Sequence, residues 1–192
     1  MITDRIKIKL ASGSPRRKQL VEEMGFSYSQ EVRQVEEILP DDIDSDKAAE
    51  YLAELKSHAF EDSEIEDGEL LLTADTVVAI GNKILGKPKS AQEAFDMIKS
   101  LSGKDHYVIT GVCLRSNKKS ISFSGFSKVT FRTLKDDEIR FYIDKFNPLD
   151  KAAAYGIQEW IGKIGVSKIN GCFYNVMGLP TSLIWEKINE HP

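Results

Sequence analysis

The sequence is poor in the residues on which disulfide-bonded and zinc-binding proteins depend. It has two cysteines in 192 residues, Cys113 and Cys172, and they form no C-x-x-C pair. Two separate buried thiols are therefore expected, rather than a disulfide or a metal knuckle. The three histidines are scattered, with no H-E-x-x-H pattern, so zinc chemistry and histidine-based triads have little support.

Long apolar runs and an excess of positive charge are also missing. Residues 1–5 carry charge where a secretory signal needs its apolar stretch, and no run approaches membrane-spanning length. The formal net charge is −4, whereas a protein that coats nucleic acid needs a broad basic surface. We expect a cytoplasmic protein that binds neither membranes nor, stably, nucleic acid.

The pattern of the chain predicts an α/β fold in one folded unit. The hydrophobic content of 41% and the length suit a single domain over residues 1–192, as one sizeable core or two closely packed lobes. Strand-like and helix-like segments are mixed, so antiparallel hairpins should lie beside any parallel core. Strands are expected at 6–10, 26–35, 70–80, 83–85, 107–114 and 120–131, and in a hairpin that turns at Asn170-Gly171. Helices are expected from Pro15 to Met24, after a Ser45 cap, after a capping box at 90–93, from Thr133 to Asn147, and from Pro180.

A mismatch of charge marks residues 10–17, which join the first strand to the first helix. Ser14 suits the N-cap and Pro15 the first helical position, so Arg16 and Arg17 fall in the first turn. Two cations at the positive end of a helix dipole are unfavourable by roughly 0.3–1 kcal/mol each. A flexible Ser-Gly-Ser segment, the free backbone N–H groups of a helix N-terminus and two guanidinium groups therefore predict a phosphate site. The alternative is a basic surface turn.

Asp75 lies inside the most apolar run of the chain, residues 70–80. A carboxylate in a buried strand is costly unless it is paired, hydrogen-bonded or bound to a metal. Because perturbed carboxylates gather at functional sites, Asp75 is the first catalytic candidate. The alternative is a structural aspartate that accepts backbone N–H bonds.

Further candidates could contact phosphate or metal. Glu36 and Glu37 carry the oxygen ligands that Mg²⁺ prefers, although an acidic pair before a loop is more often solvated. Lys87 lies at a rigid Gly-Lys-Pro corner, where its ammonium can meet a phosphate, but most lysines are solvated. Lys56 lies beside the apolar row of the second helix, and such lysines usually extend their charged head to solvent. The acidic segment 61–69 indicates a surface loop without assigned chemistry.

A single amide, Gln158, lies in the stretch 150–158, which is rich in small residues. Its donor and acceptor match the N3–H and O4 edge of uracil or thymine, so it can recognise a pyrimidine base. A surface glutamine is the alternative. Trp160 is expected to anchor this loop in the core rather than to stack on a base.

Together these motifs resemble the Maf family of nucleotide pyrophosphatases. The likeness runs from Leu10 to the last helix, with six motifs in order: S-G-S-P-R-R at 12–17, A-D-T-V-V at 74–78, G-K-P at 86–88, L-S-G with His106 and T-G-V at 101–112, Y-G-I-Q at 155–158, and G-L-P at 178–180. The resemblance implies a mixed sheet in two lobes with a central cleft, related to the inosine triphosphate pyrophosphatase fold. It also implies hydrolysis of a nucleoside triphosphate between the α and β phosphates with a divalent cation, Mg²⁺ or Mn²⁺. A homodimer is the habit of the family.

The resemblance also implies roles for single residues. Asp75 matches the catalytic residue of the family, described as a proton acceptor. Arg16, Thr76 and Gln158 fall on positions associated with substrate choice, and together they are similar to the branch that acts on dTTP and UTP. Phosphate contacts are implied for Ser12, Arg16, Arg17, Lys56 and Lys87, and metal contacts for Asp75 with Glu36 or Glu37.

The chain departs from the family pattern at two places. Ala153 stands where the family usually has glycine, which strains the loop if that position needs a positive φ. Glu159-Trp160 replaces the usual small residues after Gln158, so the base pocket is expected to be tighter or better stacked.

Two other functions fit less well. Residues 18–26 resemble the core of Nudix hydrolases, but Lys18 and Gln19 break its leading pair, and its upstream Glu and Gly would fall on Leu10 and Asp4. A nucleotide-binding factor in cell-division arrest, without turnover, is the non-enzymatic alternative. Such a binder has no need of a carboxylate at Asp75, since like charges repel beside a triphosphate unless a metal intervenes.

Overall fold

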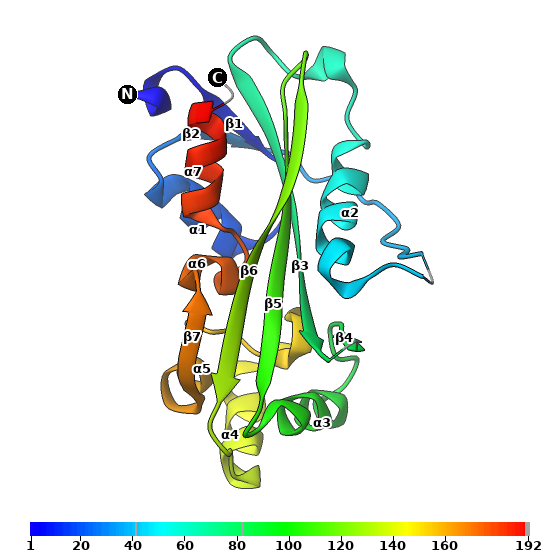
Figure 1. The fold of residues 1–192 in the computed structure, drawn as a ribbon, viewed down its shortest axis with the longest axis vertical. Coiled ribbons are helices and arrows are strands. Elements are labelled where there is room, and N and C mark those ends of the chain that lie inside the picture. Colours follow the sequence, from blue (N-terminus) through cyan, green and yellow to red (C-terminus); the bar gives the residue numbers. More distant parts are fainter. Residues whose placement is uncertain (41, 82, 191–192) are drawn as a thin grey trace. The chain divides into compact units, whose positions relative to one another are not determined.

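A computed structural model describes residues 1–40, 42–81 and 83–190 of the chain (Figure 1). The strands are β1 (Lys7–Leu10), β2 (Ser27–Gln30), β3 (Glu69–Ile80), β4 (Lys83–Leu85), β5 (Asp105–Arg115), β6 (Ser120–Phe131) and β7 (Val166–Gly171). The helices are α1 (Pro15–Glu23), α2 (Ser45–Ser57), α3 (Ala91–Leu101), α4 (Asp136–Phe146), α5 (Trp160–Gly165), α6 (Phe173–Met177) and α7 (Thr181–Glu190). Short 3₁₀ turns join several of them.

The described strands form one mixed sheet of seven strands, in the order β2-β1-β3-β5-β6-β7, with β4 paired to β3. β1 runs parallel to both β2 and β3, whereas the β3–β4 and β6–β7 pairs are antiparallel. Parallel neighbours need a crossover, and α1 supplies it between β1 and β2. The predicted α/β class with a mixed sheet is confirmed.

The chain divides into two compact units. Unit 1 comprises residues 1–75, 110–125 and 178–192, and unit 2 comprises residues 76–109 and 126–177. Unit 1 therefore holds β1, β2, α1, α2 and α7, and unit 2 holds β4, β7 and the helices α3 to α6. The expectation of a single domain over residues 1–192 stays a prediction.

The core of unit 1 follows the alternation that the sequence predicts. In β1, Ile8 and Leu10 are buried while the two lysines between and before them are not. The backbone of α2 approaches β5 so closely at Gly111 that a Cβ built there would lie 2.2 Å from the Ala49 carbonyl carbon. This close approach fixes α2, which carries one of the candidate site residues, Lys56, against the sheet.

In unit 2, local capping chemistry sets the helix ends. The Ser90 hydroxyl accepts a hydrogen bond from the Glu93 N–H, and the Glu93 carboxylate accepts one from the Lys89 N–H, as the predicted capping box requires. α4 ends at Asn147, which adopts the left-handed conformation (φ 43°) before Pro148. α3 packs against α4, with the guanidinium of Arg140 4.6 Å from the Phe95 ring centre.

One predicted element is wrong, and several boundaries differ. Asn170-Gly171 is not a hairpin turn: these residues end β7, where they pair with Lys128 and Ser127 of β6, and the chain then enters α6. Glycine is needed there for close approach, because a Cβ on Gly171 would lie 2.7 Å from the Phe126 carbonyl oxygen. The second strand is shorter than the expected 26–35, the cap of α2 is Asp44, and α4 begins after Lys135.

Both cysteines are free thiols, with Cys113 buried and Cys172 partly exposed. Across residues 1–40, 42–81 and 83–190, no helix combines the length and apolar character needed to cross a membrane.

Candidate active site

The loop from Ser12 to Arg17 joins β1 to α1 as the sequence predicts. Ser14 is the N-cap and Pro15 the first helical residue, so both arginines lie in the first turn, which contains no acidic residue. The Ser14 hydroxyl makes no capping hydrogen bond. The backbone N–H of Ser14 instead donates to the Ser12 Oγ at 3.3 Å, which curls the loop around Ser12. The unfavourable placement of two cations at a helix N-terminus is therefore real.

Arg17 is held in place from two sides within unit 1. Its Nε donates to the Gly178 carbonyl at 2.9 Å, and its Nη1 donates to the Ser12 Oγ at 3.2 Å. Burial lowers the pKa of Arg17, the nearby charge of Asp75 raises it in part, and the like charge of Arg16 lowers it again. Arg17 is thus close enough to both Asp75 and Arg16 for their charges to interact with its own.

A charged cluster forms around Lys56 in unit 1. Its Nζ lies 2.5 Å from the Asp75 Oδ1 and 2.9 Å from the Glu37 Oε1. The side chains of Lys56 and Asp75 are each 17% exposed, so the carboxylate that the apolar strand carries is paired, as its burial requires. Glu37, whose side chain is 46% exposed, makes this ion pair, and its neighbour Glu36 is also exposed.

The donor set around Asp75 suits a hard divalent cation that also binds the substrate. No group of three or more His, Cys, Asp or Glu side chains in the described part of the chain gathers into a metal cage. Asp75 and Glu37 instead present two carboxylates to one point, now bridged by the Lys56 ammonium. Mg²⁺ is commonly bound through one or two carboxylates together with substrate phosphates and water, so these two residues fit such an ion.

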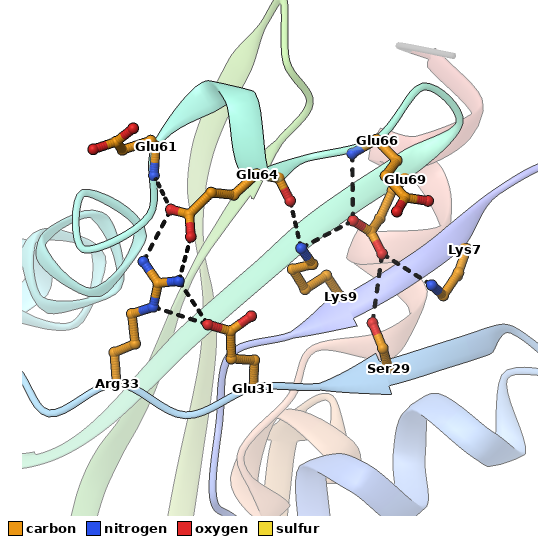
Figure 2. A network of polar contacts seen from close by, with 9 residues as sticks. All are labelled: Lys7, Lys9, Ser29, Glu31, Arg33, Glu61, Glu64, Glu66 and Glu69. Carbon is orange, nitrogen blue, oxygen red and sulfur yellow. Dashed lines mark hydrogen bonds and ion pairs between the residues drawn. The ribbon is translucent and has the colours of Figure 1, made fainter.

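The segment that leads to Glu37 is anchored by Arg33, a residue that the sequence did not single out (Figure 2). The Arg33 guanidinium binds the Glu64 carboxylate through two nitrogens, at 2.5 and 3.0 Å, and the Glu31 carboxylate at 2.6 Å. It also donates to the Ala59 carbonyl at 2.6 Å and lies 4.1 Å from the centre of the Phe60 ring. The segment 61–69 was expected to be a surface loop without assigned chemistry. Through Glu64 it instead anchors Arg33, which lies in the irregular segment that leads to Glu37.

Glu69, at the start of β3, is the most buried acid of this network (Figure 2). Its side chain is 3% exposed and lies 3.3 Å from the ammonium groups of both Lys7 and Lys9. Burial alone would raise the pKa of Glu69, but the hydrogen bonds from the two lysines outweigh it and the pKa is lowered. The register explains the contact, because Lys7 is the partner of Glu69 in the β1–β3 pair.

In unit 2, Thr76 and Lys87 lie beyond the paired part of the β3–β4 hairpin. The register runs from Ile80 with Lys83 to Val78 with Leu85, so Thr76 precedes it on β3 and Lys87 follows the end of β4. Lys87 is exposed. Its corner is tied to the loop that leads to Gln158, because the Ala153 N–H donates to the Gly86 carbonyl at 2.9 Å.

Gln158 lies in a tight turn of the same unit. The Glu159 N–H donates to the Gly156 carbonyl at 3.0 Å, which makes Gln158 the third residue of the turn. Its Oε1 is buried and has no hydrogen-bond partner among the described residues. Ala153 has a φ of 53°, so the strain expected from losing glycine at this position is present.

Trp160 is half-buried and packs edge-on against Phe141, with ring centres 4.8 Å apart. Phe141 is itself 45% exposed, so this contact lies at the surface of unit 2 and not in the core where Trp160 was expected.

The structure thus gathers the site candidates within each unit. Unit 1 brings together Ser12, Arg16, Arg17, Glu37, Lys56 and Asp75. Unit 2 contains Thr76, Lys87 and Gln158. Sequence reasoning missed the residues that hold these groups. Gln30, whose Nε2 donates to the Ser12 carbonyl at 2.7 Å, carried no local signal, whereas Gly178 lies in the G-L-P motif.

Comparison with solved structures supports the same fold. The structure of the Staphylococcus aureus Ham1 protein superposes with a TM-score of 0.53 at 16% sequence identity, covering 94% of this chain and 99% of that one. At this level of identity the match concerns the fold alone. The predicted α/β fold is confirmed, and the Staphylococcus aureus Ham1 protein shares it.

Sequence comparison reaches further. A Flavobacterium johnsoniae protein named dTTP/UTP pyrophosphatase is 47% identical over 180 residues, covering 94% of this chain and 92% of its own. A Bacteroides thetaiotaomicron protein of the same name is 46% identical over 188 residues, covering 97% of each chain. The family model described as Maf-like protein matches residues 7–191. This chain therefore belongs to the Maf family, as the six motifs of its sequence predicted.

Proposed function

We propose that this protein hydrolyses dTTP and UTP to the nucleoside monophosphate and pyrophosphate, which would clear these or related modified nucleotides from the cellular pool. Relatives of the same length, 46–47% identical, bear the name of this activity. The structural observation that carries the proposal is the pairing of Asp75 with Lys56 and the proximity of Arg17, which places a carboxylate beside the cations that a triphosphate needs.

The cations and hydroxyl of the β1–α1 loop are suited to the polyphosphate. Arg16 and Arg17 stand at a helix N-terminus, whose dipole favours an anion. The Arg17 guanidinium already contacts the Ser12 Oγ, so phosphate binding needs little rearrangement of either side chain. Lys56 and Lys87 are proposed to add point charges to the phosphates.

Asp75 is proposed to accept a proton from the attacking water. Such a role needs a carboxylate held at a fixed position, and the Lys56 ammonium lies 2.5 Å from the Asp75 Oδ1. A divalent cation, Mg²⁺ or Mn²⁺, held by Asp75 and Glu37 would neutralise phosphate charge and favour in-line attack that releases pyrophosphate. When a cation takes that position, we expect the Lys56 ammonium to move to a phosphate oxygen.

Base choice is assigned to Gln158, with Thr76 and Arg16 at the other positions associated with it. The buried, unpartnered Oε1 of Gln158 is an acceptor that lacks a donor. The N3–H of uracil or thymine would supply that donor, while the amide nitrogen would donate to O4. Cytosine presents the opposite pattern and should be rejected, because it would leave buried polar groups unpaired.

The test is pyrophosphate release from a panel of canonical and modified nucleoside triphosphates with Mg²⁺ or Mn²⁺, run beside Asp75→Asn. Turnover confined to dTTP, UTP and close pyrimidine relatives, lost in the variant with its thermal unfolding unchanged, is the expected result. Purine turnover would keep the chemistry and remove the pyrimidine assignment. Nucleotide binding without turnover would favour the cell-division factor instead, and equal activity of Asp75→Asn would refute the role of Asp75.

The same proposal places the protein in the cytoplasm, where its substrates would be found. A homodimer remains a prediction from the family, to be tested by sedimentation of the purified chain.

A further inference from the structure

Glu159 lies at the centre of a largely buried polar network in unit 2, formed with Tyr142 and Lys151. One carboxylate oxygen accepts from the hydroxyl of Tyr142, and the other lies 3.3 Å from the Lys151 ammonium. Tyr142 is fully buried in α4, and the side chain of Lys151 is 8% exposed. The Glu159 side chain is 20% exposed, and a carboxylate that is largely removed from water is stabilised by such partners.

The network closes on the turn that carries Gln158. The Gly156 N–H donates to the Tyr142 hydroxyl at 3.0 Å, and the Glu159 N–H donates to the Gly156 carbonyl at 3.0 Å. Both ends of the four-residue turn are therefore fastened to one phenol, Gly156 through its backbone and Glu159 through its carboxylate. Burial raises the pKa of Tyr142, and the hydrogen bond to Glu159 raises it further, so the phenol stays protonated and keeps donating.

Packing adds a second constraint on the same turn. A Cβ on Gly156 would lie 2.8 Å from the Glu159 Cδ, so the glutamate side chain folds back over the position where Gly156 lacks a side chain. The large residue that follows Gln158 in this chain is thus turned toward Tyr142 and Lys151.

We propose that Glu159 is a positioning residue for base recognition: held by Tyr142 and Lys151, it fixes the 156–159 turn so that the Gln158 amide presents its oxygen to N3–H and its nitrogen to O4. This inference rests on the proposed function. It names what keeps the amide in that orientation.

Orientation matters because a glutamine amide turned by half a rotation offers the opposite pattern. A fixed Gln158 matches uracil, and a rotated one matches cytosine, whose N3 accepts and whose N4 donates. Loosening the turn should therefore relax the preference for UTP over CTP. Loss of stability alone would lower both activities together.

The experiment measures kcat/KM for UTP and CTP in the wild-type protein, Glu159→Ala, Glu159→Gln and Tyr142→Phe. Tyr142→Phe keeps the ring and removes the hydroxyl that fastens the turn. Glu138→Gln is the matched control, because Glu138 of the same unit, 26% exposed, also binds a cation, Arg132, through two oxygens but stands in the first turn of α4, outside the 156–159 turn. Thermal unfolding of each variant by circular dichroism shows that all are compared while folded.

We expect the UTP/CTP ratio to fall roughly tenfold in Glu159→Ala and in Tyr142→Phe, less in Glu159→Gln, which keeps an acceptor oxygen, and not in the control. An unchanged ratio in folded Tyr142→Phe, or an equal loss for both nucleotides, would overturn the inference while leaving the proposed function intact. A wild-type protein that releases no pyrophosphate from UTP would instead remove the proposed function on which the inference rests.

Discussion

Replacing Gly111 by alanine tests whether α2 is held on the sheet as closely as the structure indicates. The added Cβ would lie 2.2 Å from the Ala49 carbonyl carbon and 2.2 Å from the Glu50 nitrogen, both backbone atoms. Carbon atoms pack at about 3.5–4.0 Å, so α2 must retreat by about 1 Å or more. The clash is with backbone atoms of α2, so no change of side-chain rotamer can relieve it.

The size of the effect follows from that rigidity. Overpacking a core costs about 1–3 kcal/mol when side chains can adjust, and here we expect the upper end, about 3 kcal/mol. This is a large share of the roughly 5–15 kcal/mol by which a domain is stable. For a chain of this length it corresponds to a fall in Tm of roughly 6–12 °C. Because α2 carries Lys56, we also expect slower pyrophosphate release from the variant, even at temperatures at which it is still folded.

Thermal and urea unfolding followed by circular dichroism measure the change, and Gly86→Ala is the matched stability control. A Cβ at Gly86 meets nothing within 4 Å, so its substitution should alter stability by no more than about 0.5 kcal/mol. If Gly111→Ala unfolded at the same temperature as Gly86→Ala, the close approach of α2 to β5 would be refuted.

Three further substitutions test single contacts. Arg33 lowers the pKa of Glu64 to about 2, below its ordinary 4.5, so this pair adds stability above pH 4.5 that is lost as the pH falls toward 2. Glu64→Gln should therefore be less stable than wild type near neutral pH, with the gap closing in acid-series urea unfolding. Burial lowers the pKa of His106 from 6.5 to about 4, so the unfolded chain takes up this proton first and stability falls as the pH drops from 6.5 to 4, by up to about 3 kcal/mol. His106→Gln should flatten that part of the curve, and an equally steep fall would contradict a buried neutral imidazole. Ala153→Gly should raise stability by about 1 kcal/mol, because glycine adopts a φ of 53° without strain, and an unchanged or lower Tm would count against strain there.

Contacts between near neighbours in the chain were the most predictable part of this protein. The placement of Ser14 and Pro15 at the start of α1, and the capping box of α3, depend on backbone groups within four residues, so residue types alone specify them. The same holds for β3, whose nearly continuous apolar run is buried as expected. Asn170-Gly171 shows the limit of such signals, because a glycine that suits a hairpin turn equally suits a close approach between β7 and β6.

The residue types by themselves determined which groups can act. A carboxylate in an apolar strand, two arginines on the wrong end of a helix and an amide in a loop of small residues were all visible before any fold was known. The tertiary structure decided which of them meet. Lys56 reaches Asp75 across 19 residues and Arg33 reaches Glu64 across 31, because the crossovers of a mixed sheet bring distant segments together. It also decided that Glu37 pairs with Lys56, a choice between two adjacent glutamates that the residue types alone left open.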